Sequence, residues 1–142
     1  MAWRYLQTGK LFLPDGAPAM HQWYSGYGEY ANQPVYEGLA DLGPIPRGQY
    51  MMTGIELNTH LGPIAIILAP DPGTRRYIEI LGRDPDSFRI HADNVKHNHT
   101  GSCGCLVSAG GSVPVWYVWD NGDRTLRVES GLPPAGSSTP GT

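Results

Sequence analysis

The chain has 142 residues with a formal net charge of −3, and 40% of its residues are hydrophobic. This length and apolar content predict one domain with a buried core. Acidic and basic side chains are interspersed and form no basic stripe, which argues against nucleic acid as a partner. No basic leader precedes an apolar segment and no apolar stretch approaches a membrane span in length. We therefore expect synthesis in the cytoplasm without a signal peptide, and no membrane insertion.

The composition favours short strands over long helices. The sequence contains 19 glycines and 13 prolines, and its apolar runs are short and bounded by turn residues. We therefore predict a mostly β fold with little helix. The domain is expected to span residues 1–131. Residues 132–142 are expected to form a flexible tail, because they carry no charge and almost no core-forming side chain.

The first half of the chain predicts a hairpin, a long loop and two central strands. Residues 2–7 and 10–13 flank Thr8-Gly9, which is typical of a hairpin turn. The next segment is rich in glycine and tyrosine without periodicity, and it predicts a long surface loop of the kind that forms the wall of a cleft. This loop covers residues 24–41, a rigid turn covers 42–48, and the strands cover 49–55 and 63–68.

The second half of the chain predicts four more short strands. Residues 77–81 and 88–91 are separated by a segment, 82–86, whose composition favours a turn. Residues 113–119 and 125–129 flank Asn121-Gly122, a dipeptide that tolerates positive φ and is common in hairpin turns. We therefore predict a closing hairpin over residues 113–129, with its apolar and aromatic side chains on a strand.

The reactive residues are a histidine and a pair of cysteines. His91 lies on an expected strand, and the two cysteines of the chain are Cys103 and Cys105. A disulfide between cysteines two positions apart would close no loop of useful length, so we expect a chemical role for them rather than a structural disulfide. A thiolate is the attacking species, and a nearby imidazole can accept the thiol proton, so we assign Cys105 as nucleophile and His91 as base. Gly104 lets peptide amides approach a developing oxyanion, and Ser102 can orient the loop or the substrate.

Several ordered motifs resemble a known family. They are the Gly-Pro-Ile-Pro-Arg-Gly-x-Tyr segment of residues 43–50, Gly82-Arg83, the Phe-Arg-Ile-His-x-Asp segment of residues 88–93, and the Ser-x-Gly-Cys segment of residues 102–105. Together they resemble the L,D-transpeptidase (YkuD-type) superfamily, and most closely its type VI secretion effector branch. The resemblance covers residues 2 to about 110. It implies a single-domain β-sandwich or open barrel.

The resemblance also implies a reaction. Cys105 would attack the carbonyl of the third residue of a peptidoglycan tetrapeptide stem and release the terminal D-alanine, leaving a thioester. Water would complete a carboxypeptidase reaction, and an amine would complete exchange or cross-linking. His91 would be the general base, the backbone carbonyl of Ala92 would orient its ring, and the amides around Gly104 would bind the oxyanion.

Substrate contacts and partners follow from the same resemblance. Arg83 and Arg89 are candidates for binding substrate carboxylates or for bracing the site, and structural salt bridges are equally expected for both. Arg47 and Asp93 complete the predicted substrate-binding set, although Arg47 can simply cap a turn. An antibacterial effector of this branch would be secreted, would act in the periplasm of a target bacterium, and would have a cognate immunity protein and a secretion-apparatus partner. No cofactor is expected.

Two alternatives remain open at this point. His97, His99, Cys103 and Cys105 are all metal-compatible and would suit a zinc-binding module, but each pair is separated by one residue, whereas structural zinc usually takes pairs separated by two to four. The other alternative is a wall-binding domain without turnover. Cys103 also departs from the family pattern, because this position seldom carries a thiol. It can compete as a nucleophile or pair with Cys105 under oxidising conditions.

Overall fold

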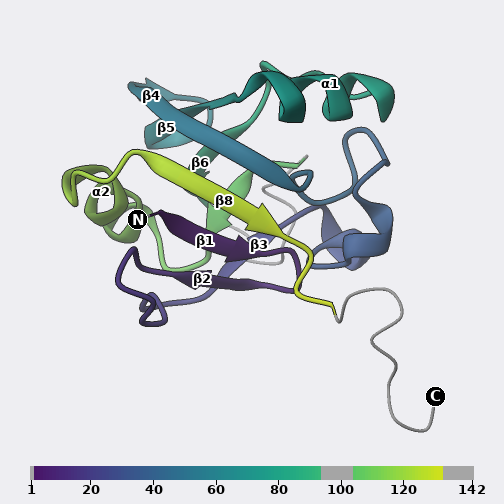
Figure 1. Ribbon diagram of the computed structural model, residues 1–142. Helices are drawn as coiled ribbons and strands as arrows, with labels where there is room; N and C mark the ends of the chain where they lie inside the picture. The colour runs from purple at the N-terminus through teal and green to yellow at the C-terminus, as the bar shows by residue number, and fades with distance from the viewer. Residues whose placement is uncertain (1, 94–103, 133–142) are drawn as a thin grey trace, which may run out of the picture.

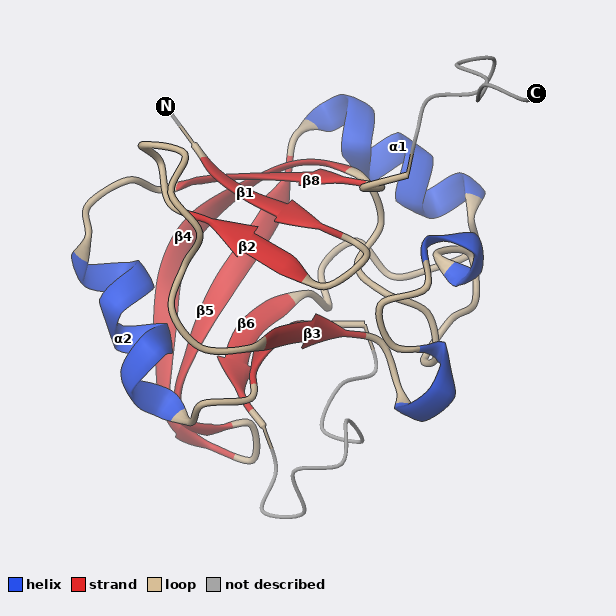
Figure 2. Cartoon of the chain, turned by 90° about the horizontal axis from the view of Figure 1, so that it is seen from below, coloured by secondary structure: helices blue, strands red, loops and turns tan. Residues whose placement is uncertain are grey.

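Eight strands form one mixed sheet that curls into a nearly closed barrel (Figure 1; Figure 2). The computed structural model describes residues 2–93 and 104–132. The strand order is β2-β1-β8-β4-β5-β6-β7-β3. The strands are β1 (Trp3–Leu6), β2 (Lys10–Phe12), β3 (Trp23–Ser25), β4 (Gly48–Thr59), β5 (Gly62–Pro70), β6 (Arg89–Ala92), β7 (Leu106–Ser108) and β8 (Thr125–Glu129). The prediction of a mostly β fold with little helix is confirmed.

The predicted hairpin and the two predicted central strands of the first half are present. β1 and β2 pair in antiparallel register around Gly9, which has a φ of 111°. β4 and β5 form a long antiparallel hairpin with a register shift between Met52 and Gly54. β5 lies between β4 and β6, so the apolar run predicted as a buried strand is central in the sheet.

The core is built by alternating side chains. Trp3 and Tyr5 of β1 are completely buried, whereas Arg4 between them is exposed. The same alternation on neighbouring strands sends their large apolar side chains into one cluster. This cluster includes Tyr50, Met52, Ile64, Ile66, Leu68, Ile90, Leu106, Leu126 and Val128. Each such burial stabilises the fold by about 1.5–3 kcal/mol before the cost in conformational entropy.

The strand predicted at residues 77–81 is wrong, because this segment belongs to the helix α1 (Pro72–Ile80). The side chain of Asp71 accepts a hydrogen bond of 2.8 Å from the Thr74 amide and caps the helix, and Pro72 occupies the first turn. These residues are the usual signals of a helix start. They stand just before the segment that the sequence predicts as a strand, and in the structure the helix that they start continues through residue 80.

The predicted closing hairpin is also wrong in its first half, because residues 113–119 lie in the helix α2 (Ser112–Asp120). Gly122 has a φ of 95° and lies just beyond the C-cap residue Asn121. Asn-Gly suits this helix end as well as a hairpin turn, because both require positive φ. Pro114 lies in the first helical turn, where a missing amide costs little. The predicted strand at 125–129 is present as β8.

The segment predicted as a long loop is mostly irregular, but its start forms a strand. β3 pairs with β7 in antiparallel register. Beyond it, two short 3-10 helices, η1 (Gly28–Tyr30) and η2 (Pro34–Tyr36), interrupt the loop. The α-helices α1 and α2 lie on different sides of the barrel, and α2 lies against β5, β6 and β7 (Figure 2). No helix within the described residues is both long and apolar enough to cross a membrane.

Candidate active site

His91 lies near the middle of the sheet. It is on β6, where it pairs with Ala65 of the antiparallel strand β5 and with Val107 of the parallel strand β7. The residue is 2% exposed. Strand pairing on both sides therefore fixes the backbone that carries the imidazole.

Cys105 lies on the same face of the sheet as His91. It immediately precedes β7, and side chains two residues apart in an extended chain share a face, so Cys105 and Val107 point the same way. Cys105 packs against a small cluster of Tyr24, Ala31 and Val107, on the face opposite to the main core. The fold thus places the histidine and the cysteine that the sequence singled out on one face of the sheet, both beside Val107. The Cys105 thiol is partly exposed and donates to the carbonyl of Ser87 at 3.7 Å.

The His91 ring is held in one tautomer. Its Nδ1 lies 2.7 Å from the carbonyl oxygen of Ala92. A carbonyl oxygen only accepts hydrogen bonds, so Nδ1 carries the proton and Nε2 keeps its lone pair. This arrangement leaves Nε2 as the atom that can accept a proton.

The environment of His91 favours the neutral ring. Burial lowers the pKa of His91 below its ordinary value of 6.5, and the charge of His60 acts in the same direction. The bond to the Ala92 carbonyl and the charge of Asp93 oppose this effect without cancelling it. His91 is therefore neutral at pH 7, as a general base must be.

Ser25 fixes the peptide that links Gly104 to Cys105. Its hydroxyl donates to the Gly104 carbonyl at 3.2 Å and accepts a bond of 2.8 Å from the Ile45 amide. In a planar trans peptide the N–H points away from the C=O, so the Cys105 amide is directed away from Ser25. Ser25 is completely buried. It joins the nucleophile segment to the turn that contains Ile45.

The guanidinium of Arg83 is bound by backbone carbonyls. Nη1 donates to Glu37 and Pro44, each at 2.7 Å, and Nη2 donates to Gly43 at 3.2 Å. The residue is 7% exposed, which leaves little of it accessible to a substrate carboxylate. A Cβ at Gly104 would overlap Nη2 of this guanidinium, so Arg83 also lies directly against the nucleophile segment.

Arg47 belongs to a network centred on Glu37. Its guanidinium forms an ion pair of 2.8 Å with the carboxylate of Glu37, which also accepts bonds from Gln7 Nε2 at 3.0 Å and from Tyr77 OH at 2.6 Å. Burial raises the pKa of Glu37, but the bonds from Tyr77, Gln7 and Arg47 outweigh it and lower that pKa overall. The network ties the turn at 42–48 to β1 and α1.

Arg89 lies on β6, two residues before His91 and on the same face, and Asp93 directly follows this strand. Arg89 forms an ion pair of 3.0 Å with Glu56, and its Nη1 donates to the Asp86 and Phe88 carbonyls. Asp93 accepts a bond of 2.6 Å from the hydroxyl of Tyr24. Asp93 therefore lies close to His91, and its charge acts on that ring.

Part of the predicted set lies outside the described residues. Ser102 and Cys103 are in this group, as are His97 and His99 of the zinc alternative. Within residues 2–93 and 104–132, no three histidine, cysteine or acidic side chains are placed to hold one metal ion.

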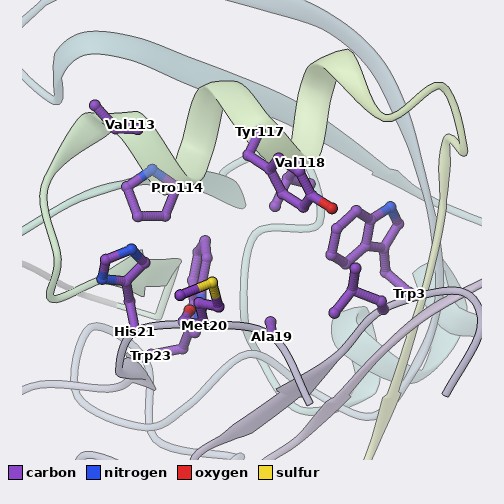
Figure 3. Close-up of a pocket in the computed structure, with 10 residues that line it drawn as sticks. Trp3, Ala19, Met20, His21, Trp23, Val113, Pro114, Tyr117 and Val118 are labelled. Atoms are coloured by element: carbon purple, nitrogen blue, oxygen red, sulfur yellow. The ribbon is translucent and has the colours of Figure 1, made fainter. Parts of the chain in front are cut away.

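A separate apolar pocket of about 240 Å³ lies between α2 and the segment that follows β2 (Figure 3). Figure 3 shows Pro114 and Tyr117 of α2 on one side, with Met20, His21 and Trp3 around the opening. The lining residues include no cysteine and no carboxylate. The pocket therefore offers no thiol nucleophile and is distinct from the His91 and Cys105 site.

Sequence reasoning did not find Ser25, Tyr24 or Glu37. All three lie in the segment that was predicted as an irregular loop, where no periodicity marks a buried position. A signal was present for Ser25, because Trp23-Tyr24-Ser25 is rich in residues with high strand propensity. No local signal marks Glu37, whose partners come from β1, the turn at 42–48 and α1.

A family model described as the Tlde1 domain matches residues 20–112, about two thirds of the chain. The matched range includes both His91 and Cys105. Comparisons with curated proteins and with solved structures found no significant match.

Proposed function

Since this chain belongs to the Tlde1 domain family of type VI secretion effectors, we propose that it is a cysteine-dependent L,D-transpeptidase or L,D-carboxypeptidase. Its substrate would be the tetrapeptide stem of peptidoglycan. The observation that carries the proposal is the buried His91, whose Nδ1 is bound to Ala92 and whose ring shares a sheet face with Cys105. The link to the wider L,D-transpeptidase (YkuD-type) superfamily is part of the proposal.

In the first half of the reaction, Cys105 is acylated. The thiol proton moves to His91 Nε2, and the sulfur attacks the carbonyl carbon of the third stem residue. The oxyanion accepts hydrogen bonds from the amides of Gly104 and Cys105. The peptide C–N bond then breaks, His91 returns the proton to the departing D-alanine amine, and a thioester remains on Cys105.

In the second half, the thioester is transferred to an acceptor. His91 removes a proton from water or from an amine, the new nucleophile attacks the thioester carbonyl, and the Cys105 sulfur leaves and is reprotonated. Water gives a tripeptide, a free D-amino acid gives an exchanged stem, and a neighbouring stem gives a cross-link.

The substrate set is proposed in two parts. Asp93 is partly exposed beside His91 and suits a cationic group of the stem, whereas Arg89 is the partly exposed cation on the same face. Arg47 and Arg83 are proposed to brace the site, because their guanidinium groups are bound to Glu37 and to backbone carbonyls. Ser102 is proposed to orient the nucleophile segment.

The biological role follows from the family. An effector with this activity would weaken the wall of a competing bacterium from its periplasm. The producing cell would then need an immunity protein that blocks the site, and delivery would require a component of the secretion apparatus.

The test is incubation of the protein with muropeptides, with and without a D-amino acid, under reducing conditions, followed by mass spectrometry. We expect loss or replacement of D-alanine with wild type and with Cys103→Ala, and no product with Cys105→Ala. His91→Ala should reduce turnover by a factor of about 100 or more. Cys103→Ala is the matched control, because it removes the other thiol of the chain.

Two outcomes would contradict the proposal. Stem binding that survives Cys105→Ala, with no product from wild type, would indicate a wall-binding domain. Stoichiometric zinc that is lost on replacing His97 and His99 would indicate a metal module.

A further inference from the structure

Arg83 lies between two segments that are far apart in the chain, the turn that contains Gly43 and the residue before Cys105. On one side its guanidinium binds the carbonyls of Gly43, Pro44 and Glu37. On the other side it lies against Gly104, the residue before Cys105. A carbonyl has no net charge, so these three bonds hold the guanidinium in place and leave its positive charge intact.

Gly104 is what allows this approach. Its φ is 127°, a value that residues other than glycine rarely adopt. A Cβ at this position would overlap Arg83 Nη2 and would lie 3.2 Å from Cε1 of Phe88, whose ring packs 5.2 Å from the guanidinium carbon. The glycine before Cys105 thus makes room for a buried cation against the nucleophile segment.

Among the described charged groups on the face of His91, none besides Arg83 offers a buried cation, because Arg89 is partly exposed and paired with Glu56. His91 is neutral at pH 7, since its pKa is lowered by burial. Asp93 is bound to Tyr24 and bears a negative charge, which disfavours an anionic sulfur. Arg83 keeps its charge at every pH relevant to the protein, because a guanidinium stays protonated even where burial lowers its pKa.

We propose that Arg83 is a positioning residue whose buried charge favours the thiolate form of Cys105 and whose carbonyl bonds fix the guanidinium against Gly104. This inference rests on the proposed function, in which Cys105 is the nucleophile. An opposite charge at close range stabilises a thiolate and makes proton transfer to His91 easier. The reverse effect supports it: burial lowers the pKa of Arg83 most strongly, and the charges of Tyr50, Asp41, Cys105 and Glu37, in that order, raise it.

The experiment measures the rate of Cys105 alkylation by iodoacetamide against pH in a Cys103→Ala background, where Cys105 is the only thiol. Arg83→Gln should slow alkylation about tenfold or more at about pH 6.5, and the two rates should converge above about pH 10, where any thiol is ionised. Arg83→Lys keeps the charge and should stay within about threefold of the parent. Arg75→Gln, an exposed arginine on α1, is the control and should change nothing.

Several results would overturn the inference. A folded Arg83→Gln protein with the pH profile of its parent would do so, as would an Arg83→Lys protein that is as slow as Arg83→Gln. If Arg83→Gln does not fold, the alkylation profile of the Cys103→Ala parent tests the inference by itself. A midpoint at the ordinary thiol pKa would exclude the effect of Arg83. Alkylation requires no substrate, so a shifted profile without muropeptide products would refute the proposed function and leave this inference standing.

Discussion

Ser25 and Gly104 show how single residues control the candidate site. Ser25 reaches from β3 to the Gly104 carbonyl, and the same hydroxyl accepts from Ile45. One buried oxygen therefore sets the orientation of the peptide before Cys105. In the proposed reaction the N–H of this peptide donates to the oxyanion. It can do so only if the peptide keeps the orientation that Ser25 sets.

Replacing Ser25 with alanine tests this role. The change leaves the Gly104 carbonyl and the Ile45 amide without their partner, so we expect turnover of muropeptides to fall about tenfold to hundredfold. Alkylation of Cys105 requires no oxyanion donor and should change little. Ser130→Ala is the control, because the Ser130 hydroxyl accepts a bond from the amide of Leu132, far from Gly104 in the chain and near the end of the described residues. Equal losses of turnover and of alkylation would instead indicate general damage to the fold.

Glu37 acts at the scale of elements, because its carboxylate joins four of them. It lies at the end of η2 and binds Gln7 after β1, Arg47 in the turn before β4, and Tyr77 of α1. Arg47 is half exposed, so its ion pair is screened by solvent and contributes little. The buried bond to Gln7 and the part-buried bond to Tyr77 are expected to contribute most of the stabilisation.

Glu37→Gln should lower the free energy of unfolding by about 2–3 kcal/mol at pH 7, because an amide cannot accept all of these bonds. The wild type should also lose stability as pH falls from 4.5 toward the lowered folded pKa, since the unfolded chain then binds a proton that the folded chain does not. The variant should lack this part of the pH dependence. Urea unfolding at several pH values measures both effects.

The control for this prediction is Glu29→Gln. Glu29 is exposed and should give wild-type stability at each pH. An equal loss in both variants would show that net charge, rather than the network of Glu37, determines the effect.

At the scale of the whole molecule, packing of the barrel core supports the strands that hold the candidate site. Ile66 on β5 is completely buried and lies between the strands that hold Tyr50 and His91. Its neighbour in sequence, Ala65, pairs directly with His91. Loosening this strand would therefore affect the packing of the core and the backbone of the site together.

Ile66→Ala should destabilise the protein by about 2–5 kcal/mol, because it leaves a cavity in a packed interior. Leu57→Ala on the same hairpin is the matched control, since Leu57 is 53% exposed, and it should cost less than about 0.5 kcal/mol. Urea unfolding gives both values. A small effect at Ile66 would mean that the core collapses around the smaller side chain.

Some features could be predicted from the sequence because their causes are local. The turn at Gly9, the alternation of β1 and the apolar run of β5 each depend on a few adjacent residues, and all three are present. The assignment of His91 and Cys105 as a reacting pair depended on residue types and motif order. The fold places both on one face of the sheet, which leaves the chemistry of the pair as a prediction for the experiments above.

The tertiary structure decided what local residues leave ambiguous. Asn121-Gly122 suits a hairpin turn and a helix end equally, and only the packing of Val115 and Val118 into the core selects α2. An arginine in a motif does not reveal its partner, because a guanidinium binds substrate carboxylates and protein carbonyls with the same geometry. The position of Arg83 was therefore decided only by the tertiary structure, in which it binds Gly43, 40 residues earlier in the chain, and lies against Gly104.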